Sequence, residues 1–170
     1  KYNLKLRINR PGIYNVWNST AAVVIGLLHG IAEEKIIYQL AKYRGVYRRF
    51  SSIIEKSGIR YYDDYAHHPT EINQLLMSAK EEAENRVIMI FQPHRYSRTQ
   101  SLYDSFCDSF KHSDYLAILP VYAAGEEYES MFDYKKFAED IKKKSNIDTY
   151  ILSRREIVKF LKNITKDGDI

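Results

Sequence analysis

The sequence predicts an α/β protein with a mostly parallel, doubly wound sheet and a leading β-hairpin. From residue 59 onward, apolar segments of strand length alternate with segments of helix length, as in strands joined by crossover helices. Residues 86–91 are almost continuously apolar, which is typical of a strand covered on both faces. Ser57-Gly58 lies between two further strand-like segments and predicts the hairpin turn.

The first 46 residues have a different pattern. Residues 2–8 alternate like a strand, and Pro11-Gly12 predicts a turn. Residues 15–30 and 33–43 predict two helices. The first of these has a broad apolar face made of Val16, Trp17, Ala21, Val24, Ile25 and Leu28. A strand and two helices do not close a sheet, so we expect residues 1–46 to be the end of a domain whose earlier part is not in this sequence.

From residue 47 onward, strands and helices are expected in turn. The predicted strands are 48–55, 59–65, 86–91, 115–121 and 148–152, with the start of another at 168–170. The predicted helices are 69–83, 97–113, 133–144 and 153–165. Each helix has a start signal: Pro69, the Ser97-x-x-Gln100 pattern, Asp133 and the Ser153-x-x-Glu156 pattern.

Length and composition narrow the function classes. The chain has 170 residues, a hydrophobic fraction of 45% and a single cysteine, Cys107, which together fit one globular domain, or one and part of another, in a reducing compartment. No apolar run approaches the roughly 20 residues that cross a bilayer, and no signal peptide follows Lys1. The net charge of +4 suggests anionic ligands, but the basic residues are spread out. We therefore expect a cytoplasmic protein that binds neither membrane nor nucleic acid.

One strand-to-helix junction gathers ionisable groups. Asp63, Asp64, His67 and His68 occupy this junction, just before Pro69. Ligands of α/β sheets bind at the carboxyl ends of strands, so these residues are candidates for acid/base or metal chemistry. Because neighbouring side chains on an extended backbone point in opposite directions, at least one of the two histidines is expected to be structural, for example as a helix cap.

A second junction carries His94, Arg95 and Arg98. Guanidinium groups bind carboxylates and phosphates bidentately, and a helix start adds N–H groups that favour an anion. We expect the two junctions to form one anion-binding site. In the alternative, the arginines pair with Asp63, Asp64 or Glu71, or are solvated. A third loop contains Gly125 and Glu126, and Glu126 could meet a cation or a substrate amine.

Several of these segments resemble one family. Residues 63–71, Asp-Asp-Tyr-Ala-His-His-Pro-Thr-Glu, resemble the C-terminal-domain signature of the Mur ligases, which are ATP-dependent, amide-forming enzymes of bacterial peptidoglycan synthesis. Four further segments are similar to family motifs in the same order: 11–18, 48–50, 91–99 and 121–126. Tyr14 stands where the family usually has histidine.

The resemblance implies a fold, a reaction and a domain order. It implies a Rossmann-like C-terminal domain at 47–170, lacking its last elements, after the end of the central ATPase domain at 1–46. The loop at 91–99 is similar to that of members that join L-alanine to UDP-N-acetylmuramate through an acyl phosphate, a step needed for cell wall biogenesis, cell shape and cell division. ATP and Mg²⁺ are implied, bound mainly outside this sequence. The chain has no Gly-x-x-x-x-Gly-Lys-[Ser/Thr] motif, so we expect it to be inactive alone.

The resemblance also implies roles for individual residues. Asn15 and Asn18 would lie near the nucleotide, Arg49 would reach its phosphate or ribose, and Asp64 would contact its ribose. The residues implied to surround the incoming L-alanine are Tyr65, His67, Arg95 and Arg98. His67 would be catalytic, because an imidazole can take the proton that the attacking amine must lose. No residue is implied to bind a metal.

Two functions from other classes compete with this one. A metal-dependent phosphoesterase would use Asp63, Asp64, His67 and His68, but His29 and His112 lie on predicted helices without ligand spacing. A nucleic-acid-binding module is suggested only by the pI near 9.0. The oligomeric state is left open by the sequence.

Overall fold

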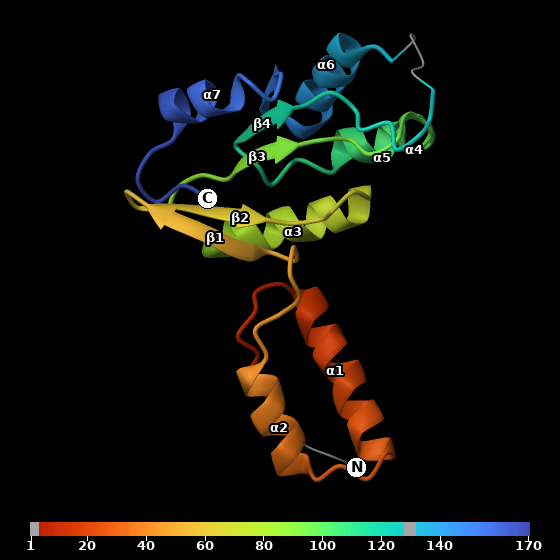
Figure 1. The fold of residues 1–170 in the computed structure, drawn as a ribbon, viewed down its shortest axis with the longest axis vertical. Helices are drawn as coiled ribbons and strands as arrows, with labels where there is room; N and C mark the ends of the chain where they lie inside the picture. The colour runs from red at the N-terminus through yellow and green to blue at the C-terminus, as the bar shows by residue number, and fades with distance from the viewer. Residues whose placement is uncertain (1–3, 128–131) are drawn as a thin grey trace.

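The centre of the molecule is a three-stranded parallel sheet in the order β3-β4-β5 (Figure 1). The computed structural model describes residues 4–127 and 132–170. The strands are β3 (Ile88–Phe91), β4 (Tyr115–Ile118) and β5 (Asp148–Ile151), and each pairs with the next in parallel register. The predicted α/β class with a parallel sheet is therefore confirmed.

An antiparallel hairpin precedes this sheet. It consists of β1 (Ser51–Lys56) and β2 (Ile59–Asp63), joined at Ser57-Gly58 as predicted. β1 begins later than expected, because Arg48 and Phe50 have positive φ angles of 57° and 45°. Such left-handed conformations interrupt an extended strand. The preceding linker is therefore a turn.

Helices α3 (Pro69–Glu82), α5 (Tyr103–Asp108) and α6 (Tyr134–Ser145) supply most of the core. Their apolar side chains pack with the sheet, and burying each one fully stabilises the fold by roughly 1.5–3 kcal/mol. The completely buried members include Ile72, Phe106, Phe110, Leu116, Ile118, Phe137 and Ile141. As predicted, α6 begins at Asp133, whose carboxylate accepts a hydrogen bond from the Lys136 N–H (2.9 Å).

The single helix predicted at 97–113 is wrong. The structure has two short helices, α4 (Tyr96–Ser101) and α5, with a break at Leu102. The Thr99 and Ser101 hydroxyls donate to the carbonyls of Arg95 and Arg98 (2.8 and 3.2 Å). Hydroxyl groups that bond to the preceding turn favour a bend in a helix, and both of these lie in the turn before the break.

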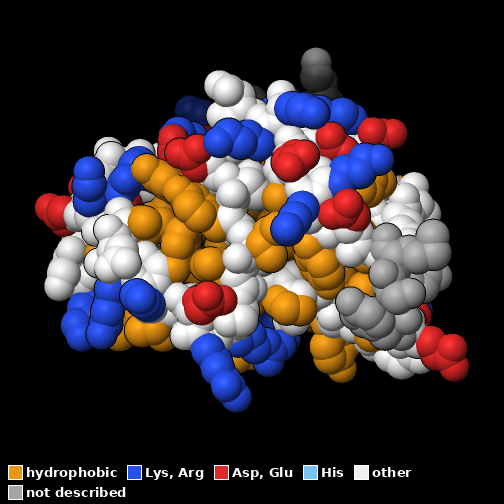
Figure 2. All heavy atoms as spheres, turned by 90° about the horizontal axis from the view of Figure 1, so that it is seen from above, with side chains coloured by type: hydrophobic (Ala, Val, Ile, Leu, Met, Phe, Trp, Pro, Cys, Tyr) orange, Lys and Arg blue, Asp and Glu red, His pale blue; other side chains and the backbone are white. Residues whose placement is uncertain are grey.

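Helix α7 (Ile157–Ile164) begins later than predicted, after a turn. The Glu156 carboxylate accepts from the Ser153 N–H (2.8 Å), so half of the predicted capping box forms. No residue of α7 is fully buried, and Val158 is 62% exposed. Figure 2 views the molecule from the side of α6 and α7 and shows apolar side chains between Lys and Arg.

Helices α1 (Ile13–Leu28) and α2 (Glu33–Lys42) form a pair that projects from the α/β unit (Figure 1). Only Ser19, Val23 and Gly26 of α1 are buried. The predicted apolar face of α1 lies largely on the surface, with Trp17 68% and Leu28 81% exposed. The reason is that α2 covers only a narrow stripe of small side chains on α1.

Two predicted strand segments are not strands. Residues 4–8 are irregular and residues 1–3 lie outside the described residues. An isolated extended segment is not a stable strand, and no described strand pairs with this one. Residues 168–170 form no regular strand either, although the backbone of Ile170 bonds to Arg86 and Ile88 (2.9 and 2.8 Å).

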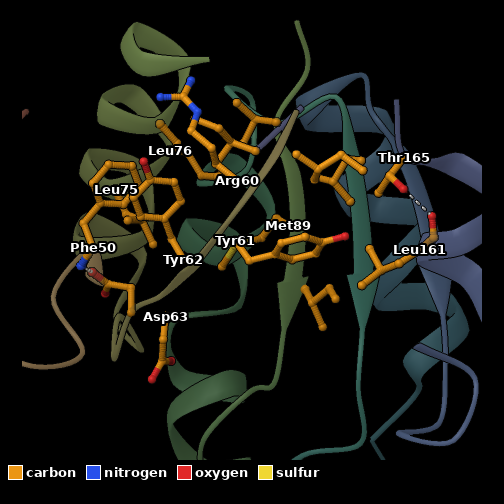
Figure 3. Close-up of a pocket in the computed structure, with 17 residues that line it drawn as sticks. Phe50, Arg60, Tyr61, Tyr62, Asp63, Leu75, Leu76, Met89, Leu161 and Thr165 are labelled. Atoms are coloured by element: carbon orange, nitrogen blue, oxygen red, sulfur yellow. Dashed lines mark hydrogen bonds between the residues drawn. The ribbon is translucent and has the colours of Figure 1, made fainter. Parts of the chain in front are cut away.

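A mainly apolar cavity of about 200 Å³ lies between the hairpin and the parallel sheet. Figure 3 shows Phe50, Tyr62 and Leu75 on one side of it and Met89 and Leu161 on the other. The hairpin and the parallel sheet are two distinct sheets, and the backbone of residues 168–170 bonds to Arg60 on one side and to Arg86 and Ile88 on the other.

Candidate functional site

Three loops meet beyond β2, β3 and β4, and a row of aromatic rings joins them. Ring centroids are 5.1 Å apart for Tyr65 and His67, 6.0 Å for His67 and His94, and 5.4 Å for His94 and Tyr122. His94 and Tyr122 also form an isolated parallel bridge. The two predicted junctions therefore lie side by side, at the edge of the sheet where ligands bind in α/β folds.

His67 is held in one orientation by two neighbours. Its Nδ1 lies 2.8 Å from the Tyr65 carbonyl oxygen and 3.6 Å from a Glu71 carboxylate oxygen. Since a carbonyl oxygen only accepts hydrogen bonds, we assign the ring hydrogen to Nδ1. In the neutral ring, Nε2 then carries the lone pair and can accept a proton.

His68 has a structural role. It is the N-cap residue of α3, and its Nδ1 accepts a hydrogen bond from the Thr70 N–H (3.3 Å). Pro69 follows as the first helical residue. The prediction that one of the two histidines caps this helix is confirmed, and it leaves His67 as the histidine that faces the other loops.

The two arginines of the second junction lie at the start of α4. Arg95 is the N-cap residue, with a φ of 71°, and its N–H donates to the Tyr122 carbonyl (2.8 Å). Arg98 places Nη1 3.4 Å from the His94 Nδ1. Burial, followed by the charge of Arg98, lowers the pKa of His94. The site thus combines fixed positive charge with neutral imidazole.

The N–H groups at the start of α4 were expected to be open to an anion, but one of them already has a carboxylate partner. The Ser97 N–H and hydroxyl both donate to the Glu126 carboxylate, and the N–H contact is 3.2 Å. Because Arg95 and not Ser97 is the N-cap residue, the predicted Ser97-x-x-Gln100 capping box does not start this helix. The Ser97 hydroxyl hydrogen bond lowers the pKa of Glu126. The carboxylate of Glu126 therefore caps α4, and its contact with a cation or a substrate amine stays a prediction.

A cleft of about 640 Å³ lies between the start of α1, the linker at 43–50 and α3. All four residues predicted to contact a nucleotide line it: Asn15, Asn18, Arg49 and Asp64. Its lining also includes the aromatic side chains of Tyr14, Trp17, Tyr43 and Phe50. The cleft thus offers flat apolar surfaces together with amide and guanidinium donors, which suits a ligand with an aromatic base and anionic groups.

Asp64 ties the linker to the loop after β2. Its two carboxylate oxygens accept hydrogen bonds from the Phe50 N–H (2.7 Å) and the Ala66 N–H (2.6 Å). Burial raises the pKa of Asp64, although these hydrogen bonds oppose the shift. Burial and the nearby Asp64 charge also raise the pKa of Tyr14. Asp64 therefore holds the linker and the loop after β2 together at the wall of the cleft.

Acidic residues pair with the linker arginines and not with those of α4. Arg48 Nε is 3.1 Å from Asp63, and Arg49 Nη1 is 3.4 Å from Glu71. The alternative in which Arg95 and Arg98 pair with Asp63, Asp64 or Glu71 is thus wrong among the ion pairs of the described residues. Glu71 and Tyr122 are site residues to which the sequence assigned no role, and His94 was placed at the second junction without one. The available signal was the spacing of four between His67 and Glu71, which lets the Glu71 carboxylate in the first turn of α3 reach back to the His67 N–H.

Within 4–127 and 132–170, no three His, Cys, Asp or Glu side chains are grouped so that they could hold a metal ion. Asp63 and Asp64, which a phosphoesterase would need as ligands, are engaged by Arg48 and by backbone N–H groups. In the same part of the chain, no helix has the length and apolarity needed to cross a membrane.

Comparison with known proteins finds a family model and several relatives that agree with one another. Residues 48–170 match the family model described as "Mur ligase, glutamate ligase domain". The UDP-N-acetylmuramate–L-alanine ligase of Pelagibacter ubique is 40% identical over 161 residues, covering 94% of this chain and 35% of that protein. The enzyme of the same name from Desulfosudis oleivorans is 43% identical over 162 residues, again covering 94% and 35%. This chain therefore spans about a third of the length of these relatives.

Solved structures agree with the fold. A UDP-N-acetylmuramate-alanine ligase from Thermotoga maritima superposes with a TM-score of 0.79 at 29% identity, covering 99% of this chain and 36% of that one. A murein peptide ligase from Psychrobacter arcticus gives a TM-score of 0.64 at 24% identity, covering 96% and 34%. The second likeness supports the fold alone.

Proposed function

This chain belongs to the Mur ligase family, and we propose on that basis that it forms part of the ATP-dependent ligase that joins L-alanine to UDP-N-acetylmuramate. The observation that carries the proposal is the row of Tyr65, His67, His94 and Tyr122 beside Arg98, in a chain 40% identical to an enzyme of that name. The reaction is a cytoplasmic step of bacterial peptidoglycan precursor synthesis.

The reaction activates a carboxylate before the amide bond forms. The lactyl carboxylate of UDP-N-acetylmuramate receives a phosphoryl group from ATP and becomes an acyl phosphate. The amine of L-alanine attacks the acyl carbon, and the tetrahedral intermediate expels phosphate. The contribution of this part of the enzyme is to hold the amine beside the activated carbon, since orientation alone lowers such barriers by several kcal/mol, up to roughly 7–11.

His67 and the arginines are assigned to the L-alanine side. The Nε2 of His67 accepts the proton that the ammonium group or the attacking amine must lose. Arg95 and Arg98 bind the alanine carboxylate through guanidinium forks, and Tyr65 forms one wall of the site. Only L-alanine with a deprotonated amine is nucleophilic, so a neutral imidazole beside fixed cations suits this step.

The cleft is assigned to the nucleotide. Asn15 and Asn18 supply amide groups to the base, Arg49 supplies positive charge to phosphate or ribose, and Asp64 contacts the ribose. Nucleotide binding supplies the phosphoryl group for carboxylate activation. Mg²⁺ accompanies ATP in such reactions, and residues 4–127 and 132–170 contain no group of three His, Cys, Asp or Glu side chains that could hold it.

Two further assignments follow from the same premise. Residues 1–46 form the end of the central ATP-binding domain, and residues 47–170 belong to the C-terminal domain. The start of the family match at residue 48 supports this boundary. Because the chain contains no phosphate-loop motif, the 170-residue chain alone should not release phosphate from ATP.

A chimera tests the proposal. This chain replaces the corresponding third of the Pelagibacter ubique ligase, and phosphate release is measured with each substrate omitted in turn. We expect release only when ATP, UDP-N-acetylmuramate and L-alanine are all present, and no release by the isolated chain. A folded chimera that binds ATP but shows no alanine-dependent release would contradict the proposed function. Release by the isolated chain would contradict its dependence on the rest of the ligase.

A further inference from the structure

We propose that Glu71 is a positioning residue that links Arg49, on the nucleotide side, to the imidazole of His67, on the amino-acid side. The role rests on the proposed function, in which His67 accepts a proton. Glu71 lines the cleft and, in the first turn of α3, is four residues from His67.

The two oxygens of this carboxylate have different partners. Oε1 lies 3.4 Å from the Arg49 Nη1. Oε2 accepts the His67 backbone N–H (3.1 Å) and lies 3.6 Å from the His67 Nδ1. A single side chain therefore contacts both of the proposed subsites, while the 2.8 Å contact with the Tyr65 carbonyl places the hydrogen of His67 on Nδ1.

Arg49 has an alternative partner. Its side chain is 48% exposed and faces the cleft in which the nucleotide is proposed to bind. A guanidinium binds phosphate bidentately, so a nucleotide phosphate competes with Glu71 for Arg49. When Arg49 turns to the phosphate, the Glu71 carboxylate loses one cation and pairs more strongly with the imidazole. His67 then becomes a better proton acceptor once the nucleotide is present.

The charges around Glu71 agree with this exchange. Burial raises the pKa of Glu71. The His67 N–H and the charges of His67 and Arg49 lower this pKa by a larger amount, so the net shift is downward. The carboxylate is therefore ionised near neutral pH and lies between the Arg49 cation and the His67 ring.

Several charged or polar groups face the His67 ring and influence its protonation. The Tyr65 carbonyl and ring lie on its own loop, and Glu71 faces it from α3. His94 faces it from the loop after β3, with Arg98 behind His94. Arg49 contacts the other oxygen of Glu71 and faces the ring through that carboxylate.

The first experiment is ¹⁵N NMR of the histidine rings in the 170-residue chain. We expect the neutral His67 ring to carry its hydrogen on Nδ1 in the unmodified protein. Glu71→Gln should move the titration midpoint of the His67 ring to lower pH, since it removes an opposite charge at close range. Glu81→Gln, on the exposed side of the same helix, is the matched control and should leave the midpoint unchanged.

A double-substitution cycle separates this link from simple charge effects. Arg49→Gln should move the His67 midpoint to higher pH, and this shift should fall by at least half in the Glu71→Gln background. Equal shifts in both backgrounds would show that Arg49 acts through space and would overturn the proposal. A hydrogen on Nε2 in the unmodified protein would also overturn it, and this measurement requires no variant. If Glu71→Gln does not fold, Glu71→Asp keeps the charge, and the weaker contact of its shorter side chain should give a smaller shift of the same sign.

The outcome is separable from that of the proposed function. The titrations use neither substrate nor turnover, so their failure would leave the chimera result intact. An inactive chimera would leave the measured link between Glu71 and His67 in place but without a catalytic role.

Discussion

The Arg98 guanidinium lies against the imidazole of His94, with 3.4 Å between Nη1 and Nδ1. A guanidinium has no hydrogen-bond acceptor, so the His94 nitrogen that faces it must carry a lone pair. Burial and the Arg98 charge both lower the pKa of His94. Arg98 is thus the stable positive charge at the point where the three loops meet.

Arg98→Ala should weaken binding of L-alanine in the active chimera. A hydrogen bond to a charged group contributes about 1.5–3 kcal/mol, so the KM for L-alanine should rise by roughly 10- to 150-fold. The kcat at saturating alanine should change much less, since the lost interaction binds the substrate carboxylate in the ground state and the transition state alike. Steady-state kinetics with varied alanine measure both constants. Lys143→Ala, on the exposed face of α6, serves as the control, and an unchanged KM in Arg98→Ala would contradict the assignment.

Asp169→Asn should be strongly destabilising. The Asp169 side chain is completely buried and lies 2.6 Å from the Arg86 Nη2. Breaking one half of a buried ion pair costs about 3 kcal/mol or more, which urea denaturation followed by circular dichroism would detect. Asp148→Asn removes an exposed pair with Lys142 and should have little effect. Similar losses in the two variants would contradict the importance of burial.

The same carboxylate should make the free energy of unfolding depend on pH in the acidic range. Burial alone raises the pKa of Asp169, but hydrogen bonds from Arg86 and from the Lys166 N–H lower it more, to below the ordinary value of 3.8. A lowered pKa means that the stabilising effect is complete well above that value and is lost as the pH falls through the folded pKa. The unfolding free energy of Asp169→Asn should therefore fall less steeply below about pH 4 than that of the unmodified chain.

Two glycines with positive φ should respond differently to alanine. At Gly12, with a φ of 90°, a Cβ atom would lie 2.3 Å from the Ser78 Oγ and 2.6 Å from the Tyr14 ring. At Gly30, with a φ of 71°, no atom lies within 4 Å of that position. Gly30→Ala should cost about 1–2 kcal/mol from backbone strain alone, and Gly12→Ala should cost clearly more. Thermal or urea unfolding of the two variants compares them directly, and an equal loss would show that the Gly12 contacts relax freely.

Cys107 should be unreactive in the folded protein. Its side chain is completely buried, and burial raises its pKa to about 11. Because the thiolate is the reactive form, a disulfide reagent at about pH 8 should modify Cys107 only when guanidinium chloride unfolds the chain. Rapid modification of the native protein would indicate that α5 opens readily.

Local patterns were sufficient to locate most helices and strands. Pro69, Asp133 and the apolar run at 86–91 each mark a feature whose cause lies within a few residues, and the structure has α3, α6 and β3 there. The break between α4 and α5 was not foreseen, because hydroxyl groups that bend a helix give the same apolar periodicity as an unbroken one. The start of α4 depends on Glu126, far along the chain, and no local pattern contains that contact.

The sequence by itself determined the fold class, the family and the identity of the residues that gather at strand ends, since these follow from periodicity and from motifs in a fixed order. Only the tertiary structure decided which charges meet. Glu71 joins Arg49 to His67, and Glu126 binds Ser97. The physical reason is that a carboxylate has several possible cations and N–H groups within reach of the chain, and the choice among them is made by the packing that brings distant loops together.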